Sequence, residues 1–316
     1  MQGVALIYNP VSGQYSARRK AAVEGALAVL RAAGIAAEIY ECDTAMGATA
    51  QAEKAIRQGC DTVLACGGDG TVHALLQSLV GTEVALGVIP LGTANALAAN
   101  LGLIGPAAKV AQKLVDAVPV RVPVGRIHYQ DRAGDAASRY FIVAAGIGAD
   151  ALLMSRLDAG LKRRFGYALY LLEAAHIWAT NSFPLFEAAF AVKGSEARRI
   201  EEISQLLAVR VRSFGGALNK LAPGATLRSE SLHLLAFRTR NRMRYMRFLL
   251  AVLFGRHTFF NGIELLETVS VECRARNGSR ATIFVEADGE VLGTLPVRME
   301  VVPQALTLLI PLNAKP

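Results

Sequence analysis

The chain has 316 residues, 53% of them apolar and 7% aromatic, so it is long enough to bury two sizeable cores and is predicted to be globular. Thirty-four Lys and Arg residues against 26 Asp and Glu residues give a net charge of +8, which favours anionic partners. Nucleic acid is not the expected partner, because no interleaving of basic and aromatic residues accompanies the charge, and no apolar run is long enough to span a bilayer.

The first residues predict a strand and not a secretory signal. No basic segment precedes the apolar run at residues 4 to 8, so we expect a cytoplasmic protein. The four cysteines show neither Cys-x-x-Cys spacing nor a metal-ligand pattern with the scattered histidines. They are therefore predicted to be reduced and mostly buried thiols.

Strands and helices are predicted to alternate through the first third of the chain. Four apolar runs indicate strands: residues 4 to 8, residues 35 to 42, the run after Asp61, and residues 84 to 91. Helical sequence follows each of them. This alternation predicts an α/β domain with a parallel, doubly wound sheet, whose ligand site lies at the carboxyl ends of the strands.

The third of these strands runs into the glycine-rich stretch Cys66-Gly-Gly-Asp-Gly-Thr-Val-His73. Its glycines are expected to adopt positive φ and to let a phosphate approach the backbone, while the N–H groups of the following helix face that phosphate. Thr71 is a candidate helix cap. An ordinary tight turn stays an alternative. Position 73 is not the third glycine of a dinucleotide fingerprint, and no Gly-Lys-Ser/Thr follows, so the pattern is neither a Rossmann fingerprint nor a P-loop.

A second, β-rich domain is predicted to begin near residues 118 to 124, where the composition changes and valines alternate with prolines and arginine. We expect a nucleotide-binding α/β domain over residues 1–118, completed by roughly 303–316, and a sandwich or small barrel over residues 119–302. The expected strands of the second domain are 183 to 192, 200 to 211, 231 to 237, 265 to 274 and 281 to 287, with helical stretches at 150 to 180 and 240 to 257.

Several motifs in a fixed order make the sequence similar to the diacylglycerol kinase catalytic domain family, which includes bacterial lipid kinases and sphingosine kinases. They are Asn9-Pro10, Gly67-Gly-Asp-Gly-Thr71, Ile89-Pro-Leu-Gly-Thr-Ala-Asn95, Gly146-Ile-Gly-Ala-Asp150, Leu221-Ala-Pro-Gly-Ala225, Asp288-Gly-Glu290 and the closing Val302-Pro-Gln-Ala-Leu-Thr-Leu-Leu-Ile-Pro311. The resemblance implies a phosphofructokinase-like first domain and a β-rich lipid-substrate domain. It also implies transfer of the γ-phosphate of ATP, with Mg²⁺, to a hydroxyl of a membrane lipid such as diacylglycerol, as in phospholipid biosynthesis.

The resemblance also implies the positions of the site residues. Those expected around ATP are Asn9, Pro10, Ser12, Gly13, Thr44, Gly67, Gly68, Asp69, Gly70, Thr71, His73, Gly92, Thr93 and Asn95. Asp69 is expected near the phosphates and their Mg²⁺. Positioning and charge neutralisation are the main needs of phosphoryl transfer, so a loop of amides plus a metal ion suits that chemistry.

The Asp-Gly-Glu motif implies the base that takes the proton of the acceptor hydroxyl, with Asp288 and Glu290 as the catalytic residues. Read without the family, the same three residues predict a hairpin turn. Asp150 is implied to bind the acceptor, and its alternative is an acid at a helix N-terminus. One departure concerns Ser229, which stands where many relatives carry an aspartate that helps hold a structural magnesium ion. We therefore expect that metal site to be altered or missing.

Basic residues run into apolar ones at two places, Arg238 to Phe254 and Lys162 to Phe165. Both predict peripheral docking on an anionic membrane surface, with a core helix that carries a solvated basic face as the alternative. Two other functions stay open, a catalytically silent nucleotide- or lipid-binding relative and a soluble-substrate kinase of the NAD kinase type. The sequence specifies neither the lipid nor the oligomeric state, and a homodimer stays open.

Overall fold

The computed structural model describes residues 1–10, 16–131, 133–156, 173, 175–191, 197–212, 222, 224–253, 262–312 and 314. Contacts divide the chain into two compact units, the first with Met1–Val124 and Pro303–Pro316 and the second with Gly125–Arg212 and Gly216–Val302. Two of the predicted site residues, Ser12 and Gly13, lie outside the described residues, as does the basic stretch Lys162 to Phe165.

The first unit is built on a parallel sheet with strand order β2-β1-β3-β4-β15. Its elements are β1 (Gly3–Tyr8), α1 (Ser16–Ala32), β2 (Ala36–Glu41), α2 (Ala45–Arg57), β3 (Thr62–Gly67), α3 (Asp69–Leu79), β4 (Ala85–Pro90), α4 (Ala96–Asn100), α5 (Ala107–Val115), the start of β5 (Val118–Gln130) and the end of β15 (Glu290–Ile310). Every residue of β3 is buried, as expected for a central strand with a helix layer on each face. The predicted doubly wound sheet is confirmed.

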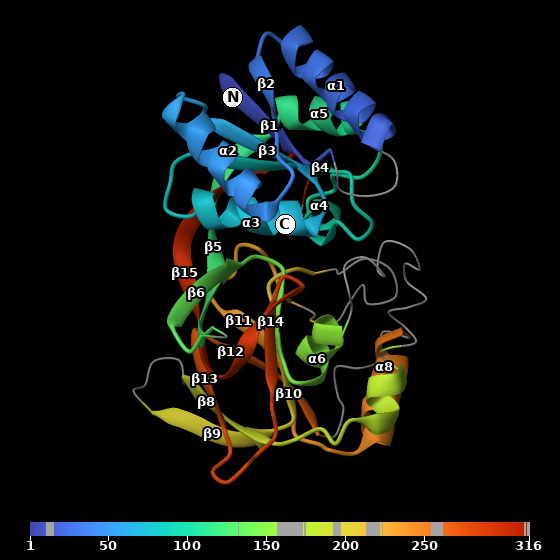
Figure 1. Cartoon of the computed structure of the whole chain (residues 1–316), viewed down its shortest axis with the longest axis vertical. Helices are drawn as coiled ribbons and strands as arrows, with labels where there is room; N and C mark the ends of the chain where they lie inside the picture. Colours follow the sequence, from blue (N-terminus) through green and yellow to red (C-terminus); the bar gives the residue numbers. More distant parts are fainter. Residues whose placement is uncertain are drawn as a thin grey trace. The chain divides into compact units, whose positions relative to one another are not determined.

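Helices cover both faces of this sheet. Helices α1 and α5 pack side by side on one face, and α2 and α3 pack together on the other (Figure 1). The close α1–α5 contact follows from small residues, since a Cβ added at Gly25 would lie 4.0 Å from the Cβ of Ala108. Val23, Ala26 and Leu30 form the buried stripe of α1, at the spacing of three and four residues that a helix face requires.

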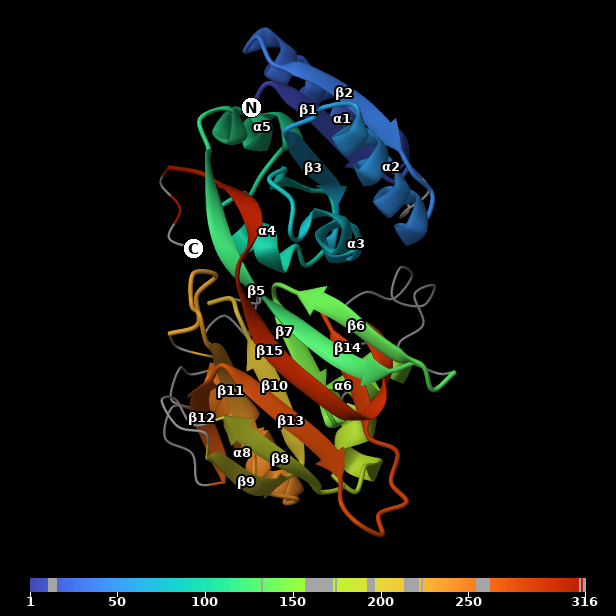
Figure 2. The ribbon, with the colours of Figure 1, turned by 90° about the vertical axis from the view of Figure 1, so that its left-hand side faces the viewer.

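The second unit is an antiparallel arrangement in which strands follow the order β12-β11-β10-β7-β14-β15, and β13, β8 and β9 continue from β15. Its elements are β6 (Ala136–Phe141), β7 (Ala144–Ile147), α6 (Ala149–Arg156), β8 (Phe186–Ala191), β9 (Arg198–Ile203), β10 (Gln205–Val209), β11 (Leu232–Phe237), α8 (Arg242–Leu253), β12 (Ile263–Thr268), β13 (Ser270–Ala275) and β14 (Phe284–Ala287). Figure 2 shows β5 between β6 and β15. The prediction of a β-rich second domain is confirmed.

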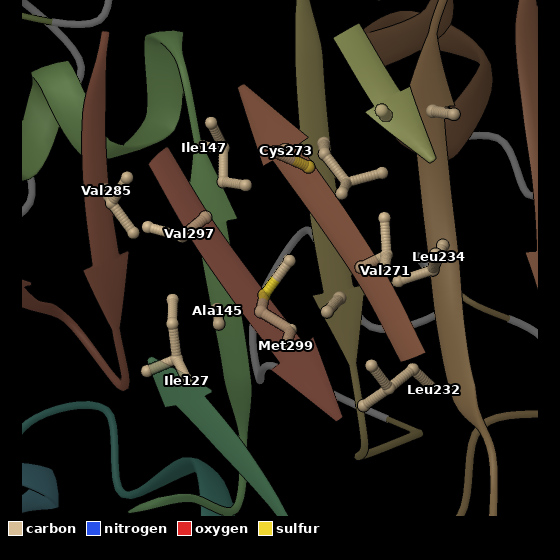
Figure 3. Close-up of a cluster of buried hydrophobic side chains, with 14 of the residues drawn as sticks. Ile127, Ala145, Ile147, Leu232, Leu234, Val271, Cys273, Val285, Val297 and Met299 are labelled. Carbon is tan, nitrogen blue, oxygen red and sulfur yellow. The ribbon is translucent and has the colours of Figure 1, made fainter. Parts of the chain in front are cut away.

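The main core of the second unit is an apolar cluster to which strands β5 to β11 and β13 to β15 contribute. Figure 3 shows its side chains converging from β5, β7, β11, β13, β14 and β15. Val271, Met299 and Val285 are each no more than 1% exposed. Burying a side chain of this size contributes about 1.5–3 kcal/mol, so this layer holds the strands in register.

Helix α8 packs against Phe237, at the end of β11. Phe237 stacks on Tyr245 with ring centroids 4.8 Å apart and meets Phe248 edge-on at 5.2 Å. The outward face of α8 leaves Met243 58% and Leu250 48% exposed. Among the described residues, no helix combines the length and the apolar character needed to cross a membrane.

Candidate active site

The carboxyl ends of the four parallel strands β1 to β4 meet at one edge of the first sheet, and the predicted ATP residues that the structure describes follow these strands. Asn9 follows β1 and donates its side-chain amide to the carbonyl of Asp43 after β2, at 2.9 Å. The loops after β3 and β4 are also joined, because Leu91 N–H donates to the carbonyl of Gly67 at 2.8 Å. The structure therefore brings together residues from four separate turns.

The glycine loop after β3 differs from the sequence prediction in its backbone. Gly68 is the N-cap residue of α3 with φ −98°, and neither Gly67 nor Gly70 has a positive φ. Close approach explains the glycines instead. A Cβ at Gly67 would lie 2.2 Å from Thr71 Oγ1, and one at Gly92 would lie 2.6 Å from the Cα of Gly68. Thr71 makes no side-chain cap of α3, so that prediction is wrong.

Asp69 ties the two glycine-containing loops together. Its two carboxylate oxygens accept the backbone N–H groups of Asn95 at 2.9 Å and Ala96 at 2.8 Å, at the start of α4. Asn95 has φ +51° and closes its own turn through its side chain, which accepts from Gly92 N–H and donates to the Gly92 carbonyl. The carboxylate thus stabilises a strained turn that holds Gly92 against Gly68.

One further predicted ATP residue, Thr44, has a structural task of its own. Thr44 is the N-cap of α2, where its hydroxyl accepts the N–H of Gly47 at 2.9 Å. His73 is 1% exposed within α3, whereas Gly70, in the first turn of α3, and Thr93, in the loop after β4, are exposed. Of the described residues predicted around ATP, Thr44, Gly70 and Thr93 are therefore the exposed ones.

Mg²⁺ has a limited but suitable donor at this edge. Among the described residues, no group of three or more His, Cys, Asp or Glu side chains could hold a metal ion. Mg²⁺ in kinases uses one or two carboxylates plus substrate phosphates and water, so a protein cage is not needed. Asp69 supplies a carboxylate at this edge, which is the kind of oxygen donor that Mg²⁺ prefers, and it also accepts the amides of Asn95 and Ala96.

In the second unit, the Asp-Gly-Glu turn between β14 and β15 is held by Asp288. Its carboxylate accepts three backbone N–H groups, those of Ile142, Val143 and Ala144, at 2.9–3.0 Å. The Asp288 N–H returns a hydrogen bond to the Ala144 carbonyl at 2.8 Å, and its φ is +48°. Glu290 is half-buried at the start of β15. The carboxylate of Asp288 therefore has a structural task in addition to any role in chemistry.

A buried guanidinium lies behind this turn. Arg210 is 0% exposed and donates to the carbonyls of Ser229 at 3.0 Å, Ser231 at 3.4 Å and Leu227 at 3.5 Å. Burial lowers the pKa of Arg210 to about 10, while the negative charge of Asp288 acts in the opposite direction. Arg210 therefore stays charged at neutral pH and links the 227–231 loop to the Asp-Gly-Glu turn.

This loop is where the family resemblance implied a structural magnesium ion. The hydroxyl of Ser229 is hydrogen-bonded to Ser231 Oγ at 2.9 Å and to His233 Nε2 at 3.2 Å. The loop carbonyls that a cation would need face the Arg210 guanidinium. Residues with neutral hydroxyls around a buried positive charge do not fit a hard divalent ion.

A second pair of acids lies beside β7. Asp150, in the first turn of α6, and Glu286, on β14, are hydrogen-bonded to each other. Burial raises the pKa of Asp150 to about 6 and raises the pKa of Glu286 further, with the charges of Asp150 and Asp288 adding to the effect. Sequence reasoning missed Glu286 and Arg210, because neither belongs to a motif and each acquires its partners only through strand pairing.

Comparison with known proteins covers nearly the whole chain. Residues 3–127 match the diacylglycerol kinase catalytic domain, and residues 142–310 match the YegS C-terminal NAD kinase beta sandwich-like domain. A diacylglycerol kinase of Mycobacterium tuberculosis is 30% identical over 98% of this chain and 95% of its own length, and one of Bacillus subtilis is 26% identical over 94% and 92%.

The fold has solved counterparts. A crystal structure of a diacylglycerol kinase from Bacillus anthracis superposes with a TM-score of 0.72 at 19% identity, covering 98% of this chain and 97% of that one. The sequence relatives, the two domain matches and the shared architecture agree with one another. The chain belongs to the diacylglycerol kinase catalytic domain family.

Proposed function

We propose that this protein is an ATP-dependent lipid kinase that transfers the γ-phosphate of ATP to a hydroxyl of a membrane lipid, with diacylglycerol as the first candidate. The observation that carries the proposal is the Asp69 link, which holds the backbone of two glycine-containing loops together at the carboxyl edge of a parallel sheet. That edge is where doubly wound folds bind nucleotides. Relatives named diacylglycerol kinase support the lipid acceptor.

In the proposed reaction, the acceptor hydroxyl oxygen forms a bond to the γ-phosphorus while the bond from that phosphorus to the β-phosphate oxygen breaks. The products are ADP and a lipid phosphomonoester. The hydroxyl proton passes to a carboxylate of the Asp-Gly-Glu motif. Asp288 and Glu290 are the two predicted candidates for this base. Asp69 is the proposed ligand of the ATP-bound Mg²⁺, which supplies neutralisation of phosphate charge. Asp150 is the proposed contact of the acceptor.

A lipid panel with labelled ATP tests this function. We expect phosphate transfer to a lipid in mixed micelles, with Mg²⁺ required, because the Gly67–Thr71 loop has no lysine to neutralise phosphate. NAD should be included as an acceptor, since its phosphorylation would favour the NAD kinase alternative. ATP binding without transfer to any acceptor would favour a silent relative.

We further propose that α8 brings the kinase to an anionic membrane. Met243, Arg247 and Leu250 share its outward face at helical spacing, so that exposed apolar side chains lie beside a basic one. Each basic residue near an anionic leaflet contributes about 1 kcal/mol, and apolar insertion adds to it. The Met243→Asp/Leu250→Asp double variant should sediment less with phosphatidylglycerol vesicles. Ile200→Asp, which changes a 69% exposed residue on β9, is the control that should not.

A further inference from the structure

The Asp150–Glu286 pair exists because β7 carries no side chain where the two acids meet. Glu286 pairs directly across from Gly146 in the β7–β14 ladder, and Asp150 lies in the first turn of α6, the helix that follows β7. A Cβ added at Gly146 would lie 2.7 Å from Asp150 Oδ2 and 2.7 Å from Glu286 Oε1. The bare Cα at position 146 therefore makes the space in which both carboxyl groups sit.

A hydrogen bond between two carboxyl groups requires one proton, because neither ionised group has a donor. The two acids differ in their surroundings. Glu286 is 3% exposed and its Oε2 accepts the N–H of Gly289 at 2.8 Å, whereas Asp150 is only half-buried. Solvent stabilises the charge of the more accessible acid, so the proton belongs on Glu286.

The charged groups around the pair agree with this assignment. Asp288, on the adjacent turn, places a second negative charge near Glu286 and so favours its neutral form. Arg210, which directly follows β10, interacts electrostatically with Asp288. Burial raises the pKa of Glu286 well above its ordinary value, and that of Asp150 to about 6. At neutral pH the pair then carries a single negative charge, located on Asp150.

We propose that Glu286 is a positioning residue that stays protonated at neutral pH and donates its proton in a hydrogen bond to Asp150, which fixes the ionised Asp150 carboxylate for the acceptor hydroxyl. This role for Asp150 rests on the proposed kinase function. Through its second oxygen Glu286 also holds Gly289, so that one side chain connects the acceptor contact to the Asp-Gly-Glu turn. Glu286 acts through Asp150 and does not itself meet the substrate.

Two substitutions of one residue separate this role from the alternatives. Glu286→Gln reproduces the protonated acid, because its carbonyl accepts from Gly289 and its amide donates to Asp150. Glu286→Ala removes both hydrogen bonds. We expect Glu286→Ala to raise the KM for the lipid about tenfold or more, and Glu286→Gln to recover to within about threefold of wild type at pH 7. Asp150→Asn, which removes the charge itself, should resemble Glu286→Ala.

The pH profile of kcat/KM adds a readout that a purely structural role would not change. Wild type and Glu286→Gln should lose activity together as pH falls through about 6, where Asp150 takes up a proton. A Glu286→Gln variant as impaired as Glu286→Ala would overturn the proposal, because it would mean that the ionised form of Glu286 is needed.

Thermal stability tests the proton on Glu286 without any catalysis. A carboxyl whose pKa is raised by folding binds more protons in the folded than in the unfolded state, so its contribution to stability is full below pH 4.5 and is lost as pH rises toward its folded-state pKa. The wild-type Tm should therefore fall with rising pH relative to that of Glu286→Gln. Parallel Tm curves would sink the proposal. If the Tm curves diverge but no lipid is phosphorylated, the protonated pair stands and the proposed function fails.

Discussion

The Asn95 backbone N–H donates to the Asp69 carboxylate at 2.9 Å, which joins two loops 26 residues apart in the sequence. Asp69 therefore has a structural role that does not depend on ATP, because it holds the two loops together. A mutation at Asp69 should therefore change stability as well as nucleotide binding.

Asp69→Asn replaces one acceptor oxygen with an NH₂ group that faces the N–H of Asn95 or Ala96. Leaving one donor unsatisfied should cost about 1–3 kcal/mol of unfolding free energy. We expect a lower Tm together with weaker ATP binding in calorimetric titration. Glu83→Gln, whose carboxylate is 90% exposed, is the matched control and should change neither. A normal Tm for Asp69→Asn would show that the loop link contributes little.

Gly92→Ala and Gly70→Ala separate packing from ligand approach. The Cβ at position 92 would lie 2.6 Å from the Cα of Gly68, so the two loops must move apart and ATP affinity should fall at least tenfold, along with the Tm. At position 70, in the first turn of α3, an added Cβ meets nothing within 4 Å and Ala favours the helix, so the Tm of Gly70→Ala should stay at or slightly above the wild-type value. A loss of ATP affinity in Gly70→Ala would then report a phosphate close to the loop, and unchanged affinity would indicate an ordinary turn.

Asp288→Asn is expected to lower both the turnover number and the Tm. Loss of a general base typically costs about 10²-fold or more in rate, and the new NH₂ group would face one of the three amides that now donate to the carboxylate. Steady-state kinetics and thermal denaturation measure the two effects. If Glu290→Gln is the more damaging change in turnover and leaves the Tm unaltered, Glu290 is the base and Asp288 holds the turn.

Arg210→Met should destabilise the second unit strongly. Removing one partner of a buried charged network costs about 3–5 kcal/mol, because Asp288 and the carbonyls of the 227–231 loop lose the charge that faces them. Arg210→Lys should recover only part of the loss, since a lysine cannot reach several carbonyls with a planar fork. In the absence of nucleotide, a chelator should leave the wild-type Tm unchanged. A drop on chelation would mean that a metal ion holds this loop after all.

Periodicity predicted the first unit well because each of its strands is short, apolar and followed by a helix. The strand predicted over residues 35 to 42 is observed as Ala36–Glu41, and that over residues 84 to 91 as Ala85–Pro90. In the second unit the apolar pattern of the sequence continues through sharp bends of the chain, so it does not mark where one strand ends and the next begins. The strand predicted over residues 200 to 211 is therefore two strands, which meet at Ser204, a buried hydroxyl bonded to the carbonyls of Phe237 and Thr239.

The motifs located the candidate site, but their roles depend on long-range contacts that no local pattern carries. A glycine in a loop suggests a positive φ, but the reason for glycine is different at these two positions. A side chain at Gly67 would collide with Thr71, and one at Gly92 would collide with Gly68. Likewise Glu286 is an ordinary strand residue until Gly146 lies opposite it. These pairings are set by strand register, which a single sequence specifies only weakly.

Strand β15 contributes to two separate sets of hydrogen bonds. Its first part pairs with β14 and β13 in the second unit, and Thr307 and Leu308 pair with β4 in the first. A fragment that ended at Val124 would leave Ala85 and Leu86 at an open sheet edge, which invites association between chains. The two units therefore cannot be exchanged between relatives by a single cut in the chain. A chimaera with a relative would need two crossover points, near residues 124 and 303, so that the closing segment stays with the half whose sheet it completes.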